Sequence, residues 1–241
     1  MHMFISLAAE KVATIFTFNI TNSTLGTLVV DVMLIVLAVT VKSTGVKKIP
    51  GALQNLVEML VEVFLEFCDS IAHAKSRIFF PIVFTFFLFI IFSNWVALLP
   101  GFSSITLQEA HKSIPVFRSP SADLSTTLAL GIFSILAVQF FGFKYLGLSY
   151  LKKYINLKGP IDFFVGILEL VLEVAKIASF AFRLFGNIFA GEVLLIVAGS
   201  LIPLISPIPV LGMELFVGFI QALVFAMLTL VFLSMSVEKA H

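Results

Sequence analysis

Long apolar runs, more than any single motif, limit what this chain can fold into. A helix needs about 20 consecutive apolar residues to cross the hydrocarbon core of a bilayer. Hydrophobic residues make up 60% of the 241 and charged residues only 12%, whereas a soluble domain carries about 45–50% and 25%. Suitable runs lie at residues 24–41, 78–99, 124–143, 163–198 and 208–237. We predict an all-α membrane protein with five membrane-spanning helices, forming one integral membrane domain over residues 1–241.

Residues 52–73 form a segment of a different kind, because polar side chains recur there every three or four residues. That spacing places them on one face of a helix, with Leu, Val and Phe opposite. The polar residues are Asn55, Glu58, Glu62, Glu66, Asp69 and His73. The pattern predicts an amphipathic helix on the membrane surface. The alternative is a helix that packs on a partner outside the membrane.

The last two apolar runs are longer than a perpendicular helix requires, so we expect them to tilt. Prolines at 203, 207 and 209 separate them, which predicts a long tilted helical hairpin. Before the third run, either Ser121 or Asp123 is well placed to cap the helix N-terminus.

Basic residues predict the orientation of the spans, since loops rich in Lys and Arg stay on the cytoplasmic side. One predicted side holds only Lys11, Lys112 and Arg118. The other side holds Lys42, Lys47, Lys48, Lys75, Arg77, Lys144, Lys152, Lys153 and Lys158. We therefore expect the N-terminus outside and the C-terminus in the cytoplasm.

Composition excludes several classes of protein. A net charge of +1 gives no indication of nucleic-acid binding, and a single cysteine, Cys68, excludes an internal disulfide. All four histidines lie outside the predicted spans, which argues against an intramembrane hydrolase. No pattern typical of a cofactor, metal or nucleotide site is present.

Two basic residues, Lys176 and Arg183, fall inside the fourth apolar run, where an ionised side chain costs several kcal/mol. At 100° per residue they share a broad stripe with Glu169, Glu173 and Asn187. Two further acids lie nearby in the sequence. Glu192 points half a turn away from Arg183, while Glu214 shares a face of the fifth run with Gln221, with Gly218 between them.

Three interpretations of these residues compete. In the first, Glu173 and Lys176 simply form a neutralising pair. In the second, Arg183 extends to the membrane interface. In the third, carboxylates relay a cation and a fixed positive charge blocks its direct passage. Arg suits the blocking role because it does not deprotonate. Glu suits the relay because burial favours its neutral form.

The stretch from Ser179 to Glu192, SFAFRLFGNIFAGE, resembles the signature of subunit a of F-type ATP synthases. The resemblance covers nearly the whole chain, because other parts match the family in the same order. The matching parts are Ser93-Asn94-Trp95 to Leu99-Pro100, Pro120-Ser121-Ala122-Asp123, and Gln221-Ala222 to Leu233-Ser234-Met235.

The resemblance implies a non-catalytic, ion-translocating stator subunit that provides two half-channels. Arg183 would separate them and face a ring of c-type hairpin subunits, each with a membrane-embedded carboxylate. Glu192 and Glu214 would line the outer half-channel with Asp123 on the path, and Asn187 and Gln221 would lie near Arg183. The cytoplasmic exit would include Glu169, Glu173 and Lys176.

Further partners would be the peripheral-stalk b subunits, the remaining ATP synthase subunits and the lipid bilayer, most consistent with a bacterial plasma membrane. The family places Glu or His at the positions of Glu192 and Glu214, often one of each. Here both are Glu, which leaves proton or sodium coupling open, with the proton as the commoner case. The alternative function is a secondary transporter in which Arg183 binds an anionic substrate, although the sequence lacks the internal repeat typical of that class.

Overall fold

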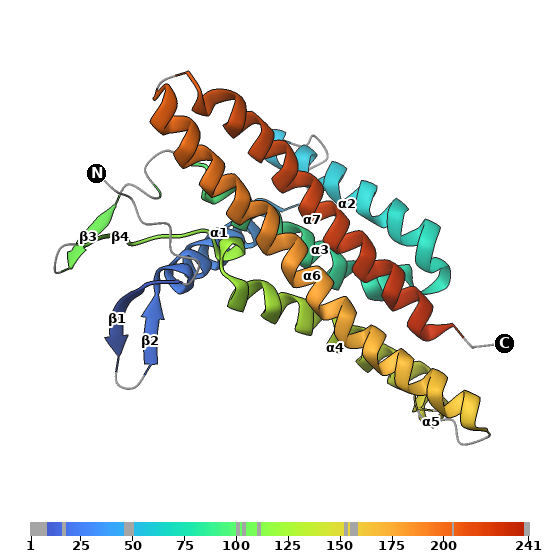
Figure 1. The fold of residues 1–241 in the computed structure, drawn as a ribbon. Coiled ribbons are helices and arrows are strands. Elements are labelled where there is room, and N and C mark those ends of the chain that lie inside the picture. Colours follow the sequence, from blue (N-terminus) through green and yellow to red (C-terminus); the bar gives the residue numbers. More distant parts are fainter. Residues whose placement is uncertain are drawn as a thin grey trace.

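Helices make up most of the structure, a computed structural model that describes residues 9–15, 18–45, 51–99, 102, 105–109, 112–151, 154, 159–203 and 205–238 (Figure 1). The α-helices are α1 (Asn22–Thr44), α2 (Ala52–Ala72), α3 (Ser76–Val96), α4 (Leu124–Leu146), α5 (Leu148–Leu151), α6 (Pro160–Leu201) and α7 (Pro207–Val237). Two 3₁₀ turns, η1 (His73–Lys75) and η2 (Pro120–Ala122), precede α3 and α4. The predicted all-α fold is confirmed.

Within the described ranges, four short strands form two antiparallel hairpins that were not predicted from the sequence. Strand β1 (Lys11–Ile15) pairs with β2 (Phe18–Thr21), and β3 (Thr106–Glu109) pairs with β4 (Lys112–Pro115). Both hairpins project from the same side of the helices, beside α1 (Figure 1). They occupy the segments that precede the first and third predicted spans, so the predicted helices remain intact.

The starts of the long helices follow from local sequence. Asp123 caps α4, because its carboxylate accepts a hydrogen bond of 3.1 Å from the backbone N–H of Ser125. Of the two capping candidates, Asp123 is therefore the one used. Pro160 and Pro207 occupy the first positions of α6 and α7, where proline removes no helical hydrogen bond.

Helix α3 ends at Val96, before the end of the predicted run at 78–99. The amides of Leu98 and Leu99 bond to carbonyls three residues back, at 3.0 and 3.2 Å, which tightens the end of α3 into a turn. Apolar composition continues past the helix here, so hydropathy alone overestimates its length.

By length and composition, four helical segments among the described residues suit a membrane crossing. They are Asn22–Ser43, Ala52–Val96, Leu124–Leu146 and Pro207–Val237. The second of them joins α2 and α3, although the backbone turns between these helices at His73, whose φ is +46°. Helix α6 carries Glu169, Glu173, Lys176, Arg183 and Glu192. The five spans remain a prediction.

The core lies where α3, α4, α6 and α7 meet. Helices α3 and α7 run antiparallel, joined at one end by a hydrogen bond of 2.9 Å from Asn94 Nδ2 to the Gly218 carbonyl. At the other end, Lys75 Nζ donates to the Val237 carbonyl at 3.2 Å. Between α4 and α7, the buried hydroxyls of Ser134 and Thr229 lie 2.8 Å apart. Polar bonds thus fix the register of an otherwise apolar core.

Helix α2 packs on the outside of α3 and α7 with its apolar side. Phe64 and Cys68 are buried, and the Phe64 ring centroid lies 4.5 Å from that of Phe87. The acids Glu62 and Glu66 are exposed, as an amphipathic helix requires. The location of α2 on the membrane surface remains a prediction.

Helix α1 touches the chain that leads into α4 at one glycine. A Cβ atom on Gly26 would overlap with the backbone carbonyl of Arg118, which has no flexible end that can move away. We expect Gly26→Ala to lower the free energy of unfolding by about 1–3 kcal/mol through overpacking. Thermal unfolding of the detergent-solubilised complex measures this change. Gly212→Ala is the matched control, because among the described residues no atom from another part of the chain lies within 4 Å of its Cβ position. A drop equal to that control contradicts the prediction.

Candidate functional site

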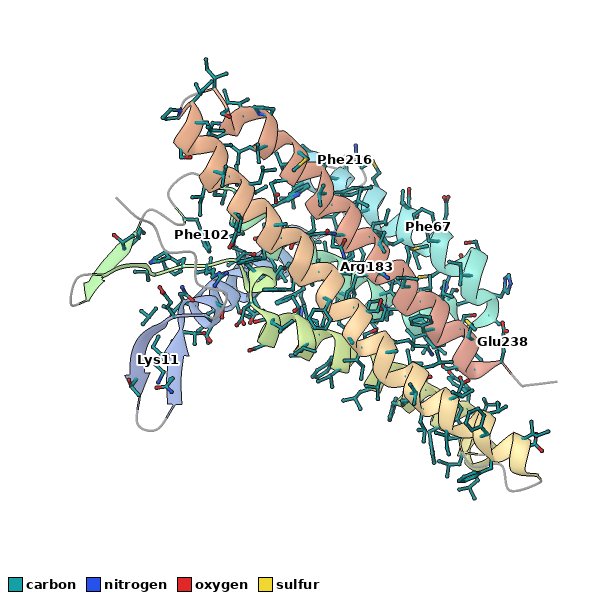
Figure 2. All side chains as sticks on the ribbon, viewed as in Figure 1. Lys11, Phe67, Phe102, Arg183, Phe216 and Glu238 are labelled. Atoms are coloured by element: carbon teal, nitrogen blue, oxygen red, sulfur yellow. The ribbon has the colours of Figure 1, made fainter. Side chains whose placement is uncertain are left out.

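Arg183 lies midway along α6, and its side chain is exposed on the helix surface (Figure 2). One turn earlier, the Ser179 hydroxyl accepts a hydrogen bond of 3.2 Å from Arg183 Nη2. One turn later, Asn187 lies on the same stripe and is also exposed. The guanidinium is therefore held along the helix surface, with its charge facing outward from this chain.

A hydrogen bond between two amides joins α6 to α7 at the level of Arg183. Asn187 Nδ2 donates to Gln221 Oε1 at 2.7 Å, and Gln221 is buried. The Nε2 atom of Gln221 is also buried and makes no hydrogen bond within the described part of the chain. Asn187 and Gln221 thus set the distance between the two helices beside the exposed Arg183.

Beyond Arg183 towards the α6–α7 connection, the two acids Glu192 and Glu214 approach each other from α6 and α7. Glu214 is buried with 4% of its surface exposed, and its carboxylate faces Gly191, where a Cβ atom would overlap with it. Glu192 interacts electrostatically with Glu214 and forms an ion pair of 3.5 Å with Arg118 Nη2. Glycine at 191 therefore makes room for a carboxylate between the helices.

Asp123 stands next to this region at the N-terminus of α4. Besides capping the helix, it accepts a hydrogen bond of 2.6 Å from the Ser23 hydroxyl of α1 through its second carboxylate oxygen. Only 8% of the residue is exposed. Since both carboxylate oxygens are bonded, Asp123 ties α1 to α4 in this structure.

A second polar cluster surrounds Glu173, before Arg183 on α6. Lys176 Nζ lies 2.9 Å from Glu173 Oε1, and the Tyr154 hydroxyl donates to the same oxygen at 3.3 Å. Gln139 Oε1 of α4 lies 3.1 Å from the same hydroxyl and is an alternative acceptor for its single proton. Burial, together with the hydrogen bond from Tyr150, raises the pKa of the Tyr154 phenol, so it remains a neutral donor. Glu169, one turn earlier, is half-buried.

The predicted site residues thus fall into two groups, with Arg183 between them. Glu173 precedes Arg183 by ten residues and Glu192 follows it by nine, which is about 15 and 14 Å along the helix axis. The neutralising pair of Glu173 and Lys176 is present in the structure. Glu192 lies on the side of α6 opposite Arg183.

Two residues with a clear structural part were missed by the sequence analysis. Arg118 was counted only as a loop charge, and Tyr154 was not selected at all. Neither belongs to a local pattern, because each reaches α6 from a connecting segment far away in the sequence. The one available signal for Arg118 was its position just before Pro120-Ser121-Ala122-Asp123.

Residues 23–234 match the family model described as ATP synthase A chain. The chain belongs to this family. Among curated proteins, ATP synthase subunit a 1 of Syntrophotalea carbinolica is 34% identical over 197 residues, covering 80% of this chain and 76% of that protein. ATP synthase subunit a of Trichlorobacter lovleyi is 32% identical over 223 residues, covering 91% and 89%. That of Syntrophobacter fumaroxidans is 29% identical over 218 residues, covering 87% and 82%.

Family membership establishes the general role of the chain. It is the ion-translocating subunit of the membrane sector of an ATP synthase, and it crosses the membrane several times. It assembles with other subunits of the enzyme and is itself non-catalytic, because the catalysis lies in those subunits. This outcome favours the ion-translocating subunit over a secondary transporter.

Proposed function

We propose that the chain provides two half-channels, one from each side of the membrane, which end at different levels of α6 and are kept apart by Arg183. The observation that carries the proposal is the exposed guanidinium of Arg183, which lies between the buried Glu173 on one side and the buried Glu214 on the other. The proton is the transported ion. It enters one half-channel, travels on a carboxylate of a rotating ring of hairpin subunits, and leaves by the other half-channel.

The outer half-channel passes Asp123, Glu192 and Glu214. Glu214 is buried between α6 and α7, and Glu192 is partly exposed, with 27% of its side chain accessible. Glu192 also lies 3.5 Å from Arg118, so two acids and a cation meet on this side of Arg183. The α6–α7 hairpin therefore offers a stepwise path towards the level of Arg183.

The inner half-channel includes Glu169, Glu173 and Lys176. One oxygen of Glu173, Oε2, is buried without a hydrogen bond among the described residues. An acceptor left open in this way is costly unless water or a proton reaches it. This favours Glu173 as a point where ions leave towards the cytoplasm.

Arg183 acts as a fixed positive charge on the ring-facing surface. It attracts each deprotonated ring carboxylate and repels a cation that would pass directly between the half-channels. Arg performs this better than Lys, because it does not lose its proton at working pH. Asn187 and Gln221 hold α6 against α7 beside it, at 2.7 Å.

The specific partners are the ring of c-type subunits at the exposed face of α6 and the b subunits of the peripheral stalk. The chain lies in a bacterial plasma membrane, with its N-terminus outside and its C-terminus in the cytoplasm. The distribution of Lys and Arg in the loops supports this orientation.

Thiol accessibility tests the two half-channels directly. Cys68 is the single cysteine and is fully buried, so Cys68→Ala provides a background without thiols. In that background, Glu214→Cys is expected to react with a membrane-impermeant thiol reagent from the outside only, and Glu173→Cys from the inside only. Vesicles of both orientations measure this, with the parent Cys68→Ala as the unlabelled control. Equal reaction of either cysteine from both sides contradicts the proposal.

A further inference from the structure

The backbone of Arg118 is held firmly between α1 and α3, outside the helices that carry the candidate site. Its N–H donates to the Asn22 carbonyl at 3.3 Å, and its own carbonyl lies against Gly26 of α1. The next residue, Ser119, donates from its hydroxyl to the Ser93 carbonyl of α3 at 3.1 Å. These contacts fix the point from which the Arg118 side chain starts.

From this anchor the Arg118 side chain extends to Glu192 of α6. Only 9% of it is exposed, and Nη2 lies 3.5 Å from Glu192 Oε2. A buried guanidinium is costly unless an anion compensates it. The charge of Arg118 therefore favours the anionic form of Glu192 over the protonated form.

Among the described residues, a fixed positive charge and a second acid face Glu192. Arg118 faces it from the segment before η2, and Glu214 faces it from α7. Two carboxylates close together in a buried site do not readily ionise at the same time, unless a cation offsets one of them. With Arg118 offsetting Glu192, a single proton remains to be exchanged between the two acids.

We propose that Arg118 is a positioning residue of the outer ion path, which holds the Glu192 carboxylate in place and keeps it ready to give up its proton beside Glu214. This inference rests on the proposed outer half-channel. The guanidinium itself transfers no proton. The charge of the guanidinium sets the outer proton concentration at which Glu192 accepts a proton and passes it on.

The test is the dependence of ATP synthesis on outer pH, measured in vesicles with the complete complex at a fixed membrane potential. Without the cation, Glu192 binds its proton more tightly. Arg118→Gln is therefore expected to move the pH of half-maximal synthesis upward by about one to three pH units. Arg118→Lys keeps the charge and is expected to retain the parental midpoint at a lower maximal rate. Lys11→Gln removes an exposed charge from the same predicted side and is expected to change neither.

Each outcome of this experiment decides something. An unshifted midpoint for Arg118→Gln overturns the inference, as does an equal shift for Arg118→Lys, because the charge would then not be the cause. If Arg118→Gln does not assemble, Arg118→Met, which keeps an unbranched side chain without the charge, is measured in its place and decides between the same outcomes. Thiol labelling of Glu214→Cys distinguishes failure of the Arg118 inference from failure of the proposed half-channel. One-sided labelling with an unshifted midpoint refutes only the role of Arg118. Two-sided labelling refutes the half-channel itself.

Discussion

Vesicles that carry the complete complex with Arg183→Ala are expected to make no ATP when an ion gradient is applied. The substitution removes the exposed cation of α6 and leaves its neighbours on the stripe in place. Each ion that leaks across 100 mV dissipates about 2.3 kcal/mol. We therefore also expect a higher passive leak through the membrane sector once the catalytic subunits are removed. Luciferase-detected ATP synthesis and a pH-sensitive dye measure the two effects.

Ser179→Ala is the matched control for Arg183→Ala. It removes the hydroxyl that accepts the 3.2 Å hydrogen bond from Arg183 but keeps the guanidinium charge. Most of the synthesis is expected to remain, since such exposed contacts contribute little. Normal synthesis in an assembled Arg183→Ala complex would mean that Arg183 is structural, and it would falsify the proposed separation of the half-channels.

The helices of this chain were predictable because a bilayer imposes its own length on each apolar run. The ends of α4 and α6 lie within about three residues of the predicted 124–143 and 163–198. The overestimate at the end of α3 has a simple cause. Hydropathy records that residues 97–99 are apolar, whereas the hydrogen bonds there already form a turn.

The stripe on α6 was predictable for a similar reason, since helical periodicity places Glu173, Arg183 and Asn187 on one face. Periodicity does not tell which neighbour each of them meets. In the structure Glu173 is buried against Tyr154, while Arg183 is exposed. These differences come from chain segments outside α6, which no local pattern records.

The ion pair of Arg118 with Glu192 shows the same limit most clearly. Its two members are 74 residues apart in the sequence, and the segment before η2 is held against α1 and α3 by backbone and side-chain hydrogen bonds. Only the packing of four elements brings them together. Charge counting placed Arg118 in a loop, and that is correct, but it gives no indication of a buried side chain.

The second large effect is expected at Gly191. Its Cβ position is occupied by the Glu214 carboxylate, so Gly191→Ala forces this flexible side chain to move. Displacing a reacting group by about 1 Å lowers rates by up to a hundredfold. We expect Gly191→Ala to reduce ATP synthesis about ten- to a hundredfold in a complex that still assembles. Synthesis rates per assembled complex, quantified on native gels, measure the effect.

A second substitution separates displacement of Glu214 from general damage to α6. Glu214→Asp shortens the acid by one methylene group and frees the space that the new methyl group needs. The double variant Gly191→Ala/Glu214→Asp is therefore expected to synthesise faster than Gly191→Ala alone, whereas two independent defects would add. Gly212→Ala introduces the same methyl group on α7, where the described part of the chain offers no tertiary neighbour within 4 Å, and is expected to be neutral. Additive losses in the double variant would show that the contact between Gly191 and Glu214 does not control ion transfer.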